Sequence, residues 1–411
     1  MKLKNGDNRV VVTGYGAVTP LGVTAGESWQ AIMDYRLGYR YVDYTARNIK
    51  THFLGLVDNE PSLIGVPAAV RRRLPRFARL TFGAARQAMA MAFGGQPPQE
   101  FYSPLDCGAI MGTGWGGLDE SYDAQSDFSA TGFASPFNCF YSMPSVTTAA
   151  CSQFWGLNGF QNTVVAACAT GTIAIGEAYE VIRTGRAQMM LAGAGESLTS
   201  PCAIWNIDVL GALSKETQDP QRASCPFSAH RNGFVLSEGA AVLCLESRGA
   251  TILGEITGYA NFSDAWDFTS PAEDCLARVQ TIISALRQAG LEPEHLDYIN
   301  AHGTSTPLND INETQSLKMA LGEAVWTVPI SSTKSYSGHL ISAAGAFESI
   351  VCLQAIANGI IPATTNFQHA DECCDLDYVV EGHRHATIRR TLNLSFGFGG
   401  ANAALILEKH S

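Results

Sequence analysis

Short apolar segments that end in glycine recur along the first half of this chain. They are residues 9–16, 107–114 and 189–195. Runs of this length, rich in Val, Ile, Leu, Ala and Met and followed by glycine, predict buried strands that lead into turns.

Between these segments, apolar residues recur at helical spacing. Residues 25–35 predict one helix, and residues 171–184 predict another, which Gly185 ends. The inward face of the second helix would carry Ile175, Ala178 and Ile182. Alternating strands and helices predict an α/β protein with largely buried sheets.

A similar order returns in the second half of the chain. Residues 253–260 loosely repeat the opening strand and turn. The later predicted elements are a helix at 276–290, a strand at 296–301, a helix at 343–358, and strands at 390–396 and 403–407. The pattern indicates two similar halves, residues 1–252 and 253–411. The chain has no linker rich in Pro, Ser or charge, so we expect the halves to be fused.

Composition excludes several classes of protein. The 411 residues are 46% hydrophobic and 16% charged, which suits a large core and excludes disorder. The net charge of −11 argues against a nucleic-acid partner. We find no uncharged apolar stretch long enough for a membrane span, and the polar N-terminal residues do not resemble a signal peptide. We therefore expect a cytoplasmic protein without a membrane partner.

The cysteines give no sign of a metal site. Eleven cysteines occur, none of them in a Cys-x-x-Cys pair, and Cys373 and Cys374 are adjacent. We expect most of them to be small buried residues in a reducing compartment.

Cys168 is different because it lies where a short strand gives way to a helix, between the small residues Ala167 and Ala169. Backbone N–H groups at a helix start stabilise an anion, so we expect Cys168 to be a thiolate nucleophile. The alternative is another buried structural cysteine.

Two histidines lie in distant loops. His302 begins the segment His-Gly-Thr-Ser-Thr-Pro, and His339 ends the segment Lys-Ser-Tyr-Ser-Gly-His, which starts at Lys334. An isolated histidine at a strand end is more often structural. Neutral imidazole N–H groups can also stabilise an oxyanion beside a nucleophile.

Five segments of the chain resemble those of β-ketoacyl-acyl-carrier-protein synthases. They are the Cys168 segment, the two histidine segments, residues 224–240, and Leu-Ser-Phe-Gly-Phe-Gly-Gly-Ala-Asn at 394–402. The resemblance runs from about residue 10 to 407 and is closest to the type II elongating enzymes. It implies a thiolase-like fold of two similar halves with mixed sheets, in a five-layered α-β-α-β-α arrangement, with the active site between the halves.

The resemblance also implies the roles of individual residues. Cys168 would carry an acyl group, while His302 and His339 polarise a malonyl thioester during decarboxylation. Lys334 would be a buried partner of Glu348 and Glu313. The implied oxyanion hole and gate are Cys168, Phe398, Phe396 and Gly399. The substrate and phosphopantetheine contacts would be Thr304, Thr306, Ser270 and Trp115, and Asp310 would join the structural network. No cofactor or metal is implied, because phosphopantetheine arrives on the carrier protein.

Some positions depart from the family pattern. The family usually has Asp at the position of Ser228, in a structural turn. It often has Asp at the position of Asn232, in a nearby loop. Trp115 replaces a smaller residue, and would either fill the acyl pocket or pack at a dimer interface. The second basic patch of many members is missing, since residues 126–132 contain no Lys or Arg.

Five arginines cluster in nine residues of this acidic chain, in a predicted helix that Pro75 interrupts. They are Arg71, Arg72, Arg73, Arg76 and Arg79. The cluster is either a solvated face or a docking surface for an acidic acyl carrier protein.

The resulting hypothesis is a dimeric acyltransferase, either a homodimer or a heterodimer with a related ketosynthase or chain-length-factor subunit. It would condense an acyl group with malonyl-carrier protein in fatty acid, polyketide or polyene synthesis. One alternative is a non-catalytic chain-length-factor-like subunit, which the presence of Cys168, His302 and His339 disfavours. The other is a thiolase acting on coenzyme A esters, whose second cysteine near the C-terminus is replaced here by the Phe-Gly-Phe-Gly-Gly segment.

Overall fold

The computed structural model describes residues 6–410. Part of the polar N-terminal segment interpreted above, residues 1–5, lies outside the described residues. The strands of the first half are β1 (Val10–Val18), β4 (Cys107–Gly112), β5 (Gln161–Val164), β6 (Met189–Glu196) and β8 (Gly239–Glu246). Those of the second half are β9 (Gly254–Ser263), β10 (Tyr298–Asn300), β11 (Ile330–Ser331), β14 (Arg390–Gly397) and β15 (Ala401–Glu408).

The two sets of strands have the same topology. Across the sheet the order is β5-β4-β6-β8-β1 in the first half and β11-β10-β14-β15-β9 in the second. In each half two parallel pairs are followed by two antiparallel pairs. β1 also pairs with β9, which joins the halves. The predicted repeat of two similar halves with mixed strands is confirmed, and the β1–β9 pairing joins them into one ten-stranded sheet. The exact boundary at residues 252 and 253 stays a prediction.

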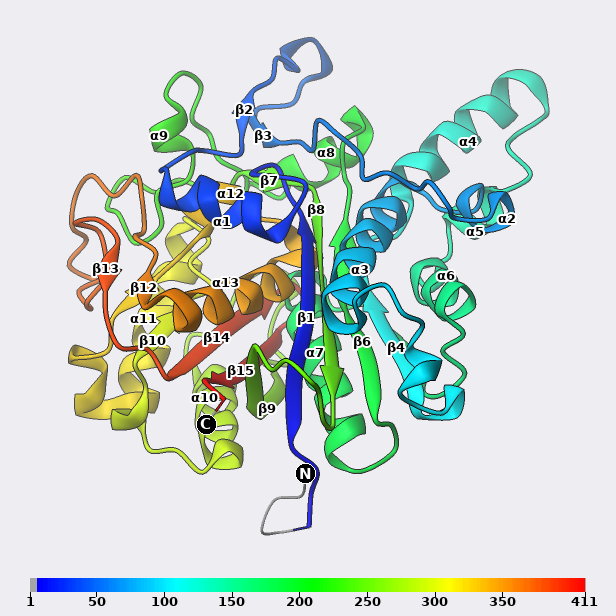
Figure 1. Ribbon diagram of the computed structural model, residues 1–411. Helices are drawn as coiled ribbons and strands as arrows, with labels where there is room; N and C mark the ends of the chain where they lie inside the picture. The colour runs from blue at the N-terminus through cyan, green and yellow to red at the C-terminus, as the bar shows by residue number, and fades with distance from the viewer. Residues whose placement is uncertain (1–5, 411) are drawn as a thin grey trace.

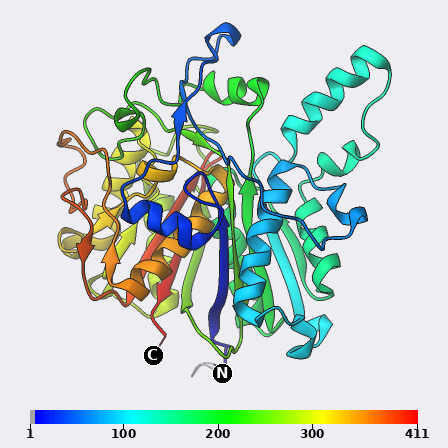
Figure 2. The same ribbon diagram turned by 45° about the horizontal axis from the view of Figure 1, so that its top comes forward.

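Helices complete five layers (Figures 1 and 2). The helices of the first half are α1 (Ala25–Met33), α2 (Ala68–Arg71), α3 (Arg76–Phe93), α4 (Leu118–Thr131), α5 (Asn138–Tyr141), α6 (Val146–Trp155), α7 (Thr170–Arg183), α8 (Pro201–Asp208) and α9 (Pro220–Ala223). The second half has α10 (Leu276–Ala289), α11 (Pro307–Leu321), α12 (Lys334–Ser337) and α13 (Ala344–Asn358).

The central layer is formed by α7 and α13, which contact each other and strands of both halves. α3 and α6 cover the outer face of the first set of strands, and α10 covers that of the second, with α11 packed against α10. Two small sheets lie outside these layers. They are β2 (Arg40–Tyr41) with β3 (Phe53–Gly55) and β7 (Leu236–Ser237), and β12 (Ile360–Ile361) with β13 (Arg384–His385).

The central helices are almost completely buried. Ile175, Ala178 and Ile182, the predicted inward face of α7, are each 0% exposed. The segment Ile341–Asn358, which includes α13, is long and apolar enough to cross a membrane, but 83% of it is buried inside the fold. We therefore interpret it as a core helix that supports the loops at its N-terminal end.

The predicted glycine turn after the first strand is wrong, because β1 continues through Gly14 and Gly16. These glycines allow close approach of a helix: a Cβ on Gly14 would lie 2.1 Å from the carbonyl oxygen of Ala88 in α3. The second half uses the same device, since a Cβ on Gly258 in β9 would lie 2.2 Å from the carbonyl oxygen of Ala285 in α10. Glycine in a strand can therefore mark helix contact rather than a turn.

Candidate active site

Cys168 lies in a single 3-10 turn, Ala167–Ala169, between β5 and α7. Ala167 has a φ of +45°, in the left-handed region that costs energy for a residue with a Cβ. The turn is fixed locally, because the Ala166 N–H donates to Thr170 Oγ1 at 2.8 Å. This places Cys168, which is 5% exposed, immediately before the central helix.

His302 follows β10, and two carboxylates on α11 hold its loop. The backbone N–H groups of His302 and Gly303 each donate to Glu313 at 2.7 Å. The Thr304 N–H donates to Asp310 at 3.1 Å. Glu313 and Asp310 are completely buried, so the predicted structural network is present in the geometry.

His339 is oriented by the turn that follows it. The Ile341 N–H donates to His339 Nδ1 at 3.1 Å, with Ile341 held at a φ of +49°. Since Nδ1 accepts this bond, the proton of the neutral ring belongs on Nε2. Nε2 is buried and donates to no atom among residues 6–410, so it is free to donate to a substrate oxygen.

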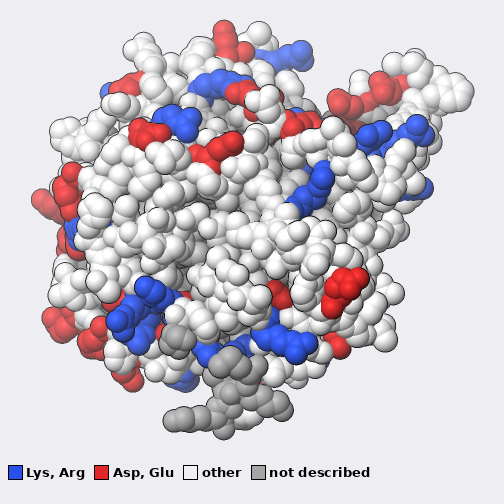
Figure 3. Space-filling view, viewed as in Figure 1, with Lys and Arg blue, Asp and Glu red and all other residues white. Residues whose placement is uncertain are grey.

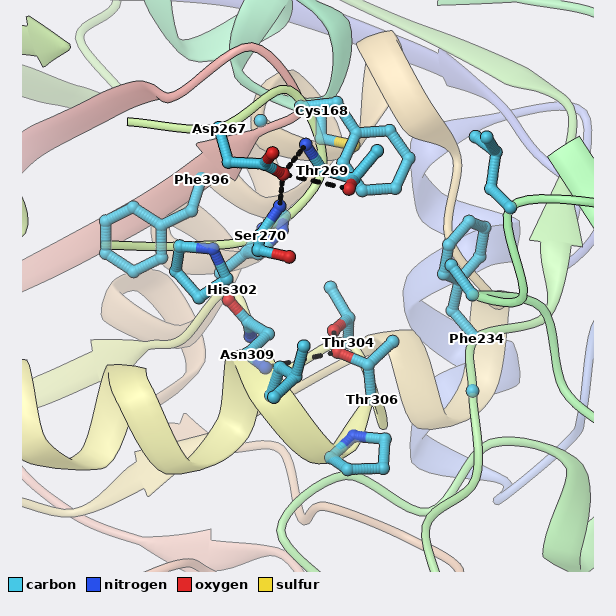
Figure 4. Close-up of a pocket in the computed structure, with 18 of the residues that line it drawn as sticks. Cys168, Phe234, Asp267, Thr269, Ser270, His302, Thr304, Thr306, Asn309 and Phe396 are labelled. Carbon is cyan, nitrogen blue, oxygen red and sulfur yellow. Dashed lines mark hydrogen bonds between the residues drawn. The ribbon is translucent and has the colours of Figure 1, made fainter. Parts of the chain in front are cut away.

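The three side chains meet at one point. The sulfur of Cys168 and ring nitrogens of His302 and His339 all lie within 4.8 Å of one another. The two imidazole rings have centroids 5.4 Å apart and are nearly perpendicular. In Figure 4, Cys168 and His302 lie on one side of the open cavity, and Phe234, which packs on His339, lies on the other.

Both histidines are neutral at physiological pH. Burial lowers the pKa of each imidazole well below 6.5, and the charge of Lys334 lowers it further. Neutral imidazoles can donate to a developing oxyanion without carrying a buried charge of their own.

Burial opposes the thiolate that the helix start predicts. Burial raises the pKa of Cys168 to about 12, outweighing the lowering effects of the Lys334 charge and of the backbone N–H groups of Phe398 and Cys168. The helix start is where it was predicted, but the surrounding apolar residues disfavour the charged form more strongly. At neutral pH this pKa favours the thiol form of Cys168.

Lys334 forms a buried ion pair with Glu348, whose side chain is 2% exposed. Burial raises the pKa of Glu348, and Lys334 opposes that rise. Of the two predicted partners, Glu348 is thus confirmed. Glu313 is wrong as a direct partner, because its carboxylate is engaged by the His302 loop and by Asn309.

The loop after β14 passes directly against Cys168. A Cβ on Gly397 would lie 2.8 Å from the carbonyl oxygen of Ala166 and 3.2 Å from the Cys168 nitrogen, so only glycine fits. Gly399 has a φ of +81° and donates to the Phe268 carbonyl at 2.8 Å. The loop brings the Phe398 N–H to the sulfur, the geometry expected of an oxyanion hole.

A cavity of about 340 Å³ leads to these groups. Its lining includes the predicted contacts Thr304, Thr306 and Ser270 together with Phe396 and Phe398. Figure 4 shows Thr304 and Thr306 on one wall, joined by a hydrogen bond of 2.9 Å, with Ser270 on a loop nearer the histidine.

Trp115 does not line this cavity as the structure describes it. It packs instead against an apolar cluster that contains Cys168, Leu198 and Ile341. Its turn is held by Glu196, which accepts from the Gly114 N–H at 2.7 Å. This placement leaves its role in limiting the acyl chain a prediction.

Two of the five clustered arginines are held in ion pairs and, within the described part of the chain, the other three are not. Pro75 separates α2 from α3 as predicted, and Arg76 forms ion pairs with Glu60 and Glu238. Arg79 also pairs with Glu60. Arg71 and Arg72 are exposed, whereas Arg73 is half-buried over the Phe140 ring. The positive charge available to a partner is therefore that of Arg71, Arg72 and Arg73.

Two residues at the site were missed from the sequence. Asn309 joins the network by donating to both Asp310 and Glu313. Arg278 lines the cavity and is 6% exposed. It precedes the buried Ile282 by four residues, so helical spacing could have placed this arginine on the inward face of its helix.

The buried thiol predicts a distinctive pH profile. We expect alkylation of Cys168 by iodoacetamide to accelerate about tenfold per pH unit from pH 7 to 10, without a plateau, because the thiolate fraction keeps rising below a pKa of about 12. Peptide mass mapping would separate Cys168 from the exposed Cys139 and Cys202, which serve as controls. A plateau in the alkylation rate below pH 9 would contradict a Cys168 pKa of about 12.

Comparison with known proteins identifies the family. The N-terminal domain model of beta-ketoacyl synthases matches residues 7–250, and the C-terminal domain model matches residues 253–368. The chain is 36% identical over 411 residues to 3-oxoacyl-[acyl-carrier-protein] synthase 2 of a Synechocystis species, covering 98% of each chain. It is 35% identical over 414 residues to a protein of Streptomyces halstedii named as a polyketide beta-ketoacyl synthase, covering 97% of each.

Solved structures agree over nearly the whole chain. A beta-ketoacyl synthase from Burkholderia phymatum superposes with a TM-score of 0.90 at 32% identity, covering 98% of this chain and all of that one. The ketosynthase in a complex with its type II polyketide acyl-carrier protein gives a TM-score of 0.89 at 32% identity, with the same coverage. This chain, with its two matching halves and the cysteine and histidines between them, belongs to the β-ketoacyl synthase family.

Proposed function

We propose that this protein catalyses the decarboxylating Claisen condensation of an acyl group on Cys168 with a malonyl group on an acyl carrier protein. The observation that carries the proposal is the meeting of the Cys168 sulfur with His302 and His339 nitrogens within 4.8 Å. The product is a β-ketoacyl carrier protein. The sulfur is the nucleophile, and the imidazoles stabilise an oxyanion.

The first half-reaction transfers the acyl group. The Cys168 sulfur attacks the carbonyl of the incoming thioester, whose oxygen accepts from the Cys168 and Phe398 N–H groups. The C–S bond to the carrier then breaks. The thiol proton ends on the released phosphopantetheine sulfur. Coupling proton loss to attack avoids a free thiolate, which burial disfavours.

The second half-reaction breaks a C–C bond. The malonyl thioester oxygen accepts from His339 Nε2 and from the neutral His302 ring as the carboxylate leaves as carbon dioxide. The electron pair of the broken bond passes into the enolate. Its carbon attacks the acyl thioester, and the Cys168 sulfur departs as a thiolate that takes a proton from solvent water.

Two alternative functions explain fewer of the residues at this site than the condensation does. A non-catalytic chain-length-factor-like subunit has no use for a preformed cysteine and histidine cluster. A thiolase acting on coenzyme A esters needs a second cysteine near the first, and Cys168 is the only cysteine lining the described cavity. Relatives of both fatty acid and polyketide type leave the pathway open.

We extend the proposal to partners, cofactors and place of action. The partners are an acidic acyl carrier protein and a second ketosynthase-fold subunit, either another copy or a chain-length factor. Solved relatives include complexes with a carrier protein and with a chain length factor. We propose a cytoplasmic enzyme that needs no cofactor and no metal. A sulfur and two imidazoles also suit zinc, so metal analysis of the purified protein is a direct check.

Separating the two half-reactions tests the proposed chemistry. Cys168→Gln lacks a nucleophile but keeps both histidines, so it should lose condensation and still release carbon dioxide from malonyl-carrier protein. His302→Ala or His339→Ala should lower carbon dioxide release by about 10²- to 10³-fold, the effect of removing one oxyanion donor. Full release from both histidine variants would falsify their role.

Charge reversal tests the docking surface. Arg72→Glu with Arg73→Glu should raise the KM for the carrier protein several-fold and weaken its salt dependence, because long-range attraction to an acidic partner is lost. The alkylation rate of Cys168 should stay the same. Arg287→Glu, an exposed arginine on α10, is the matched control. Figure 3 shows Lys and Arg side chains gathered over α2 on this face of the molecule. If the KM and salt dependence are unchanged in the double variant, this surface does not bind the carrier.

A further inference from the structure

Arg278 is a buried arginine that faces the active-site cavity with most of its donors unused. It is 6% exposed and lines the same cavity as Cys168 and His302. Nη1 donates to Asn309 at 3.1 Å. Within residues 6–410 this is the one hydrogen bond of the guanidinium, Nε is buried without a partner, and Arg278 forms no ion pair.

The guanidinium is held in a fixed place. Its central carbon lies 4.1 Å from the centroid of the Phe396 ring, and that ring lies 5.7 Å from the His302 ring. Asn309, which accepts from Arg278, donates in turn to Glu313, the carboxylate that holds the His302 loop. Arg278 is therefore positioned by the same network as the histidine, one aromatic ring away from it.

A buried guanidinium without a direct ion pair is costly, because the group keeps its charge at all physiological pH values. Glu313, Asp264 and Asp310 attract it from beyond ion-pair distance, which offsets part of this cost. They leave its free edge without an acceptor. Guanidinium N–H groups match a carboxylate in charge and hydrogen-bonding geometry, so a carboxylate is the ligand that suits this wall of the cavity.

We propose that Arg278 recognises the carboxylate of the malonyl substrate and so distinguishes the two acyl carriers that enter one cavity. The inference rests on the proposed function. In a malonyl thioester one methylene separates the carbonyl, which the histidines would hold, from the carboxylate. The acyl donor of the first half-reaction has no carboxylate. Arg278 therefore favours the second substrate without affecting the first.

This role has a kinetic consequence. The attraction between Arg278 and the carboxylate exists in the bound substrate and is lost as neutral carbon dioxide forms. Such an interaction strengthens binding of the ground state and does not lower the barrier to C–C cleavage. Removing the charge should therefore raise the KM for malonyl-carrier protein, while kcat for carbon dioxide release stays the same or rises.

The experiment compares Arg278→Met with Arg287→Met, which removes an exposed arginine from the same helix. We expect Arg278→Met to raise the KM for malonyl-carrier protein by about tenfold or more, as befits a lost charge-assisted hydrogen bond. The KM for acyl-carrier protein in acylation of Cys168 should not change. Both carriers bear the same phosphopantetheine phosphate, so an equal rise in both KM values would assign Arg278 to the phosphate and overturn the proposal.

Other outcomes are also decisive. A fall in kcat for both half-reactions with unchanged KM values would make Arg278 structural only. Arg278→Gln keeps a polar neighbour for Asn309, and the same KM shift is expected from it if Arg278→Met fails to fold. If the wild-type protein releases no carbon dioxide from malonyl-carrier protein, the proposed function fails. If the wild-type protein releases carbon dioxide and the variants keep the wild-type KM for malonyl-carrier protein, only the role of Arg278 fails.

Discussion

Burial of the reacting groups between the two halves is the constraint on which the site depends. The nucleophile and both histidines lie beside the central helices α7 and α13, where no more than 5% of any of these three side chains is exposed. Burial keeps the imidazoles neutral and the thiol protonated. The resting site therefore carries no charge on its three reacting groups and gains its electrostatic effect only when a thioester oxygen begins to take up charge.

The buried charges around the site are held by contacts that also fix geometry. Glu313 accepts from two consecutive backbone N–H groups and so sets the His302 loop, while Lys334 is neutralised by Glu348 on α13. The end of β14 needs Gly397 because its backbone touches the Cys168 turn. The Glu313 and Lys334 contacts join neighbouring elements of the second half, whereas the Gly397 contact joins the two halves, so the packing of the halves also sets the geometry of the site.

Much of this arrangement could be predicted from the sequence. The periodicity of α7 placed Ile175 and Ile182 inside, and the motifs around Cys168 and His339 indicated one shared site. These signals are local, because they depend on residue type and short spacing. The duplication was also visible, although weakly, in the order of strands and helices.

The remainder depends on tertiary contacts. The protonated state of Cys168 depends on how much apolar surface surrounds it. The pairing of Lys334 with Glu348 rather than Glu313 depends on which helix, α13 or α11, presents its carboxylate to Lys334. Arg76 belongs to an arginine cluster that the sequence leaves open between a solvated face and a docking surface, but ion pairs to Glu60 and Glu238 occupy it. Gly14 was assigned to a turn, because the sequence does not reveal the helix that packs against it.

The central claim is that Cys168 carries the acyl group which the malonyl-derived carbanion attacks. Intact-mass analysis of the protein after mixing with acyl-carrier protein should show one acyl adduct, mapped to Cys168. Addition of malonyl-carrier protein should then remove that adduct. Carbon dioxide and a carrier-bound β-keto product two carbons longer should appear at the same time. An adduct on another residue, or one that persists while the product forms, would contradict the account.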